Sequence, residues 1–166
     1  MNIGRLFLDV QGTITSKSYY NYATEIERSK ILLKKLIAKD NIDELRISIV
    51  SSECIEDVEK IAEHLEQRLE GIDKIHFGHH HADSKMMHIG GIIREDKKNK
   101  CEQMIANLGV CNHIICYYAD DCNINRIIAR AEIQHFYPNM KLVIFNPKDE
   151  ALLGLNDEVQ KYLKNI

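Results

Sequence analysis

Three carboxylates, two serines and a group of lysines stand where apolar runs of this sequence begin or end. The segments are Asp9-Val10-Gln11-Gly12-Thr13, Ser51-Ser52, the lysines Lys97, Lys98 and Lys100, and Asp120-Asp121. Gathered at one place, the carboxylates would repel one another strongly unless a cation lay between them, and oxygen ligands of this kind suit Mg²⁺. A hydroxyl and an ammonium beside them would hold the other oxygens of a phosphate. The residue types therefore predict phosphoryl transfer, in which catalysis is mostly positioning and charge neutralisation.

Alternating hydrophobic patterns predict the elements that position these segments. Short apolar runs predict strands at residues 5–9, 45–50, 72–77, 113–118 and 141–145. Apolar residues at spacings of three and four predict helices over 25–39, 55–69, 101–108 and 124–131, and Asn156 is expected to cap a last helix. Residues 78–96 are expected to be irregular, with a hairpin near 86–93 as a further possibility. The alternation predicts an α/β fold: a doubly wound, Rossmann-like parallel sheet of about five strands with helices on both faces.

The order of the motifs resembles that of the haloacid dehalogenase superfamily. Asp-x-x-Gly-Thr follows the first strand, Ser51 follows the second, a lysine precedes the fourth, and Asp-Asp follows the fourth. The resemblance extends over about residues 3–146. It implies a Mg²⁺-dependent hydrolase, usually a phosphatase, with its site at the carboxyl ends of the strands, where the connections reverse direction.

The resemblance also implies a role for each acidic motif residue. Asp9 would be the nucleophile that attacks phosphorus and becomes an aspartyl phosphate. The ligands of Mg²⁺ would be Asp9, the backbone carbonyl of Gln11 and the side chain of Asp120. Asp121 would be a further ligand or would act through a bound water.

Hydroxyl groups and one lysine would hold the phosphate. Thr13 and Ser51 would hydrogen-bond its oxygens, and Ser52 is the second choice for that role, with a helix N-cap as its other interpretation. Lys97 would neutralise charge on the nucleophile and the phosphate. The resemblance favours it because it lies eleven residues before Leu108, which matches the usual end of the helix that follows this lysine in the family. Lys98 and Lys100 remain open for the same role.

Gln11 is a departure from the family pattern. Phosphatases of the family usually carry an aspartate there, which protonates the leaving oxygen and then activates water. An amide has no titratable proton near pH 7, so we expect slow hydrolysis of simple phosphomonoesters. An imidazole of His79–His81 could replace the missing group, or these histidines belong to a surface loop without a specific role. The alternative function is a catalytically impaired module that binds a phosphorylated ligand or a protein partner.

The intervals between the motifs leave little room for an inserted cap domain. One turn region and one helix fill the interval from Thr13 to Ser51, and about twenty spare residues lie between Ser51 and Lys97. We therefore expect a capless or minimally capped member with an open site. Such a site favours a macromolecular substrate over a small one, or a homo-oligomer whose partner subunit covers it.

Composition sets the remaining expectations. The 166 residues suit one domain, 1–166, and the 22 basic against 25 acidic residues give a net charge of −3, which does not indicate nucleic acid. The apolar run before Asp9 is far too short for a signal peptide or a membrane span. Five cysteines without a Cys-x-x-Cys pair are typical of reduced thiols, so we expect a cytoplasmic location.

Overall fold

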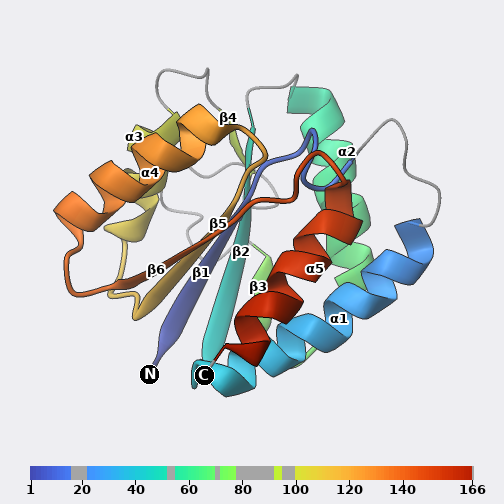
Figure 1. The fold of residues 1–166 in the computed structure, drawn as a ribbon, viewed down its shortest axis with the longest axis horizontal. Coiled ribbons are helices and arrows are strands. Elements are labelled where there is room, and N and C mark those ends of the chain that lie inside the picture. Colours follow the sequence, from blue (N-terminus) through green and yellow to red (C-terminus); the bar gives the residue numbers. More distant parts are fainter. Residues whose placement is uncertain (16–21, 52–54, 70–71, 78–91, 95–99, 166) are drawn as a thin grey trace.

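A parallel sheet lies at the centre of the computed structural model, which describes residues 1–15, 22–51, 55–69, 72–77, 92–94 and 100–165 (Figure 1). Its main path runs β3-β2-β1-β5-β6, and every pairing between the described strands is parallel. A sixth strand, β4, pairs with β2 beyond the end of β3. The strands are β1 (Ile3–Leu8), β2 (Glu44–Ser51), β3 (Ile75–Phe77), β4 (Ile92–Arg94), β5 (Ile115–Ala119) and β6 (Lys141–Phe145).

Five described helices cover the two faces of the sheet (Figure 1). Side chains of β1 alternate between two apolar cores: Leu6 and Leu8 pack with α1, α2 and α5, whereas Phe7 packs with α3 and α4. The sheet is therefore buried on both sides, which confirms the predicted Rossmann-like α/β architecture. The helices are α1 (Tyr22–Lys39), α2 (Ile55–Leu69), α3 (Lys100–Leu108), α4 (Asn123–Phe136) and α5 (Ala151–Lys164).

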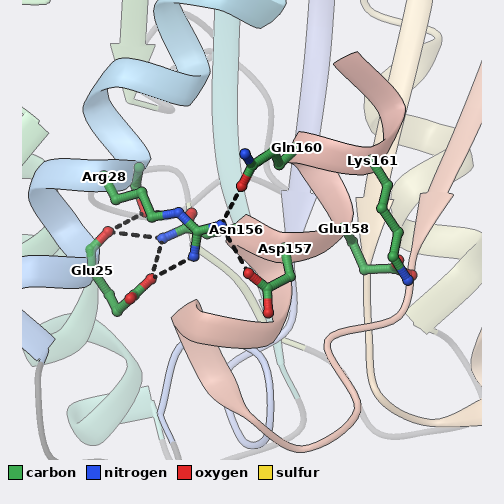
Figure 2. Close-up of polar contacts among 8 residues, drawn as sticks. Glu25, Arg28, Asn156, Asp157, Glu158, Gln160 and Lys161 are labelled. Atoms are coloured by element: carbon green, nitrogen blue, oxygen red, sulfur yellow. Dashed lines mark hydrogen bonds and ion pairs between the residues drawn. The ribbon is translucent and has the colours of Figure 1, made fainter. Parts of the chain in front are cut away.

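The expectation that Asn156 caps the last helix is wrong. Helix α5 begins at Ala151, and Asn156 lies in its interior with 2% of its surface exposed. Its amide nitrogen donates to the backbone oxygen of Glu25 at 2.8 Å and to Oε2 of Glu25 at 2.9 Å, and its Oδ1 accepts from Ser29 at 2.8 Å. Figure 2 shows this joint between α1 and α5, where Arg28 also contacts Asp157. A capping residue type thus serves here as a buried cross-link between two helices.

Two further segments differ from the expected elements. The third strand begins at Ile75 rather than at residue 72, because Asp73 and Lys74 form a turn and Lys74 has a left-handed backbone with φ of 71°. Part of the stretch expected to be irregular forms β4, which continues the edge of β2 after β3 has ended. Among the described helices, none combines the length and the apolar character that a bilayer crossing requires.

Candidate functional site

Two neighbouring strand ends place Asp9 and Asp120 side by side. Leu8 of β1 pairs in register with Ala119 of β5, so the residue after each strand emerges at the same edge of the sheet. The backbone nitrogen of Asp9 donates to the oxygen of Ala119 at 3.0 Å. Carboxylate oxygens of Asp9, Asp120 and Asp121 all lie within 4.8 Å of one another. The structure therefore brings together the three carboxylates that the sequence singled out.

The lysine that lies between these carboxylates is Lys100. Its Nζ is 2.8 Å from Oδ1 of Asp9 and 2.8 Å from Oδ2 of Asp120, and only 5% of its side chain is exposed. Lys100 is the first residue of α3, so the start of that helix directs its ammonium to the strand ends. Lys97, the first choice from the sequence, and Lys98 lie outside the described residues. Lys100, one of the alternatives left open, therefore occupies the expected position.

Burial and one shared cation set the charge states of the site. Burial, against the opposing attraction of Lys100, raises the pKa of Asp9 to about 7. Burial would also raise the pKa of Asp120, but the Lys100 ion pair and the donated hydrogen bonds lower it below its ordinary value. Burial together with the charge of Asp120 raises the pKa of Asp121. For Lys100, burial opposes the charged form, yet its two carboxylate partners raise its pKa. Within the part of the chain that the structure describes, one ammonium lies among three carboxylates, so the cluster can accept further positive charge.

Asp120 has a dense set of hydrogen-bond donors. Tyr118, whose hydroxyl donates to Oδ2, precedes it by two residues on β5. The Nδ2 of Asn125 also donates to Oδ2 at 3.1 Å, and the backbone nitrogen of Cys122 donates to Oδ1 at 2.9 Å. The side chain of Asp120 is fully buried. Sequence reasoning missed Tyr118 and Asn125, because neither belongs to a motif and only the fold shows which oxygen they contact.

The turn after β1 requires the glycine of the first motif. Gly12 has φ of 79°, a left-handed backbone that disfavours side chains. A Cβ at this position would lie 2.2 Å from Oδ2 of Asp121 and 2.9 Å from Oδ1 of Asp149. The backbone oxygen of Val10 accepts from the nitrogens of the next residues, Thr13, Ile14 and Thr15. The absence of a side chain at Gly12 is what lets Asp121 approach the turn.

The other residues of the first motif differ in exposure. Gln11 is exposed, so its amide lies at the surface of the turn. Thr13 is fully buried, and its Oγ1 has no hydrogen-bond partner among the described residues. A buried hydroxyl of this kind is costly unless a partner reaches it. Because Thr13 is fully buried, a phosphate oxygen could reach this hydroxyl only if the surrounding residues moved.

Asp149 is a fourth carboxylate near the turn, and the sequence analysis did not select it. It lies in the loop between β6 and α5. The Oδ1 atom of Asp149 and the Oδ2 atom of Asp121 both approach the position that a Cβ of residue 12 would occupy. Lys148 and Asp149 in this loop have left-handed backbones, as does Ala151 at the start of α5. The nitrogen of Ala151 donates to the oxygen of Gly12 at 3.3 Å. No motif signals this residue, because its approach depends on the conformation of a loop distant in sequence.

The remaining predicted residues lie wholly or partly outside the part of the chain that the structure describes. Ser51 is the last residue of β2 and pairs with Arg94 of β4, so its backbone is at the carboxyl edge of the sheet. Its side chain is outside the described part, as are Ser52 and His79–His81. Their roles stay predictions.

Comparison of the chain with protein-family models, with curated proteins and with solved structures gives no match.

Proposed function

We propose that the chain is a Mg²⁺-dependent phosphoryl-transfer hydrolase of the haloacid dehalogenase type, which acts through an aspartyl phosphate on Asp9. The observation that carries this proposal is the convergence of Asp9, Asp120 and Asp121 within 4.8 Å at the ends of two adjacent strands. The lysine ammonium between two of them supplies the positive charge that a phosphate would need.

The donor set fits a hard divalent cation. Three carboxylates offer oxygen atoms within 4.8 Å of one another, and Mg²⁺ prefers oxygen ligands. Asp9, Asp120 and Asp121 would hold the ion, with the backbone carbonyl of Gln11 as the ligand that the resemblance adds. When bound, Mg²⁺ would neutralise charge on the carboxylates and on the phosphate, so that two anions can approach.

The proposed reaction begins with attack of an Asp9 oxygen on phosphorus. The bond from phosphorus to the leaving oxygen breaks, and Asp9 becomes an acyl phosphate. Water then cleaves this acyl phosphate, which returns the carboxylate and releases inorganic phosphate. Lys100 holds Oδ1 of Asp9 at 2.8 Å and favours the ionised form that attacks.

Gln11 limits the rate of this reaction. Its amide can donate a hydrogen bond but cannot give a proton to the leaving oxygen, which must take it from solvent or from another group. General acid–base help is typically worth 10²–10⁴-fold, so turnover of simple phosphomonoesters should be slow. Gln11 also favours the second candidate function, a module that binds a phosphorylated ligand or a protein without turning it over.

Beryllium fluoride, a phosphate analogue, tests whether Asp9 accepts a phosphoryl group. With Mg²⁺ present, we expect a stable adduct on the wild-type chain, detected by ¹⁹F NMR, and none on Asp9→Asn. A wild-type chain that binds neither Mg²⁺ nor the analogue would refute the proposal.

Turnover of an aryl phosphate separates the two candidate functions. If the chain is a hydrolase, we expect slow wild-type turnover that Asp9→Asn abolishes. Gln11→Asp should accelerate this turnover by about 10²–10⁴-fold. Turnover by Gln11→Asp alone would instead favour the binding module.

A further inference from the structure

Two consecutive tyrosines of β5 make the same contact on opposite faces of the sheet. Tyr117 and Tyr118 are both buried, with 0% and 1% of their surfaces exposed. The hydroxyl of Tyr117 donates to Oδ2 of Asp40 at the end of α1, and the hydroxyl of Tyr118 donates to Oδ2 of Asp120. Only the second contact belongs to the candidate site. The neighbouring tyrosine therefore provides a matched comparison within the same strand.

The donors around Asp120 are distributed unequally between its two oxygens. Oδ2 accepts from Lys100 at 2.8 Å, from Asn125 at 3.1 Å and from the Tyr118 hydroxyl. Oδ1 accepts one described hydrogen bond, from the backbone nitrogen of Cys122 at 2.9 Å. A carboxylate has about four acceptor positions, two on each oxygen. The donors among the described residues thus fill Oδ2 and leave an open position on Oδ1.

We propose that Tyr118 is a positioning residue of the metal site, whose hydroxyl holds Oδ2 of Asp120 so that Oδ1 remains available as the metal ligand. This inference rests on the proposed function, because it concerns the ion that Asp120 would bind. Tyr118 itself touches neither ion nor substrate. It acts through the orientation of Asp120.

The burial of Tyr118 within β5 makes it suited to this role. Its ring packs in the apolar core formed with α3 and α4, together with Phe7, Met104 and Leu108. The hydroxyl is therefore fixed relative to the strand end, whereas Asn125 is only partly buried near the start of α4. Without the phenol, the carboxylate can turn about its last torsion and exchange its two oxygens. Loss of such outer hydrogen bonds typically weakens metal binding by 10–100-fold.

Mn²⁺ binding to Tyr118→Phe tests the proposal without relying on catalysis. Mn²⁺ replaces Mg²⁺, and electron paramagnetic resonance measures the free ion during titration. We expect the dissociation constant to rise by about 10–100-fold for Tyr118→Phe. Tyr117→Phe, which removes a buried phenol-to-carboxylate bond away from the site, should stay within about twofold of wild type under the same principle.

A second measurement distinguishes positioning from a general loss of structure. The concentration of Mg²⁺ that gives half-maximal aryl phosphatase activity should rise for Tyr118→Phe, while turnover at saturating Mg²⁺ returns to near the wild-type value. If Tyr118→Phe does not fold, Asn125→Ala removes another donor to the same oxygen from a partly exposed side chain. Weaker Mn²⁺ binding by that variant would then support the proposal, and unchanged binding would overturn it.

The outcomes separate this proposal from the proposed function. Unchanged or tighter Mn²⁺ binding by Tyr118→Phe overturns the positioning role and leaves the metal site standing. An equal loss for Tyr117→Phe also overturns it, because the effect would then follow from loss of any buried phenol. A wild-type chain that binds no Mn²⁺ refutes both.

Discussion

Lys100 reaches Asp9 across 91 positions of the chain, with its Nζ 2.8 Å from Oδ1 of the aspartate. The same ammonium is equally close to Asp120, so one cation holds the ends of β1 and β5 together. All three side chains are largely buried. Removal of the lysine would leave two close carboxylates without their shared counter-charge.

Lys100→Met should therefore lower the free energy of unfolding by about 3–5 kcal/mol, the usual cost of breaking a buried ion pair. Urea unfolding at pH 7.5 measures this loss. The same variant should lose aryl phosphatase activity, whereas Lys97→Met should keep both activity and stability. A greater activity loss in Lys97→Met than in Lys100→Met would assign the role to Lys97 after all.

Gly12→Ala should disrupt the site through the position of Asp121. The new methyl group would lie 2.2 Å from Oδ2 of that carboxylate, which must move, and the left-handed backbone adds about 1–2 kcal/mol. We expect a lower midpoint of thermal unfolding together with weaker Mn²⁺ binding.

Gly109→Ala is the matched control for that variant. Its Cβ would come no closer than 3.3 Å to another atom, the Tyr137 hydroxyl, and its φ lies outside the left-handed region. Mn²⁺ binding should be unchanged in this control. Normal metal binding by Gly12→Ala would contradict the described approach of Asp121 to the turn.

His113 should make stability depend on pH. Burial, with help from the charge of Arg5, lowers its pKa to about 4, and its Nδ1 donates to the oxygen of Leu108 at 3.1 Å. The unfolded chain takes up this proton near pH 6.5, before the folded chain does. The contribution of neutral His113 to the free energy of unfolding is therefore complete above pH 6.5. It declines as the pH falls and is smaller by about 2 kcal/mol at pH 5.

The variant His113→Gln isolates this contribution from that of Asp9, which has the opposite sign. Because the pKa of Asp9 is raised to about 7, this carboxylate takes up a proton in the folded chain at a higher pH than in the unfolded chain. Its protonation therefore stabilises the folded chain as the pH falls from about 7. Urea unfolding of both proteins between pH 7 and pH 5 should show a steeper decline for wild type. Parallel profiles would mean that His113 is not held neutral in the folded chain.

Asn156→Ala should loosen the joint between α1 and α5. It removes the donor to Glu25 and the acceptor of Ser29 in a buried setting, which should cost about 1–3 kcal/mol of unfolding free energy. Asp157→Ala removes the neighbouring contact with Arg28 from a side chain that is 52% exposed, and should cost less than about 1 kcal/mol. Chemical denaturation compares the two variants. Equal effects would contradict the structural role of Asn156.

Patterns of local sequence predicted most of the fold. Apolar runs at 45–50 and 141–145 became β2 and β6, because a strand that packs against apolar cores on both faces needs little beyond apolar side chains. The pattern failed at Asn156, since a polar residue buried between two helices looks the same in sequence as a helix cap. It also missed β4, a three-residue strand whose pairing depends on where β3 stops.

The carboxylates of the site were predictable and their partners were not. Asp9 and Asp120 follow strands, and strand ends of a parallel sheet meet at one edge. The choice of Lys100 among three lysines depends on where α3 begins, and sequence patterns locate helix boundaries poorly. Tyr118 and Asp149 could be found only from coordinates, because their contacts come from burial and loop conformation.

The central place of β1 has a consequence for how the molecule is made. Both neighbours of this strand, β2 and β5, come later in translation, and β5 is separated from it by about two thirds of the chain. Until residues 115–119 have left the ribosome, one edge of β1 has no partner and is open to pairing with other chains. Because the Asp9 end of β1 is completed only by β5, the cluster of Asp9, Asp120 and Asp121 can form only late in synthesis.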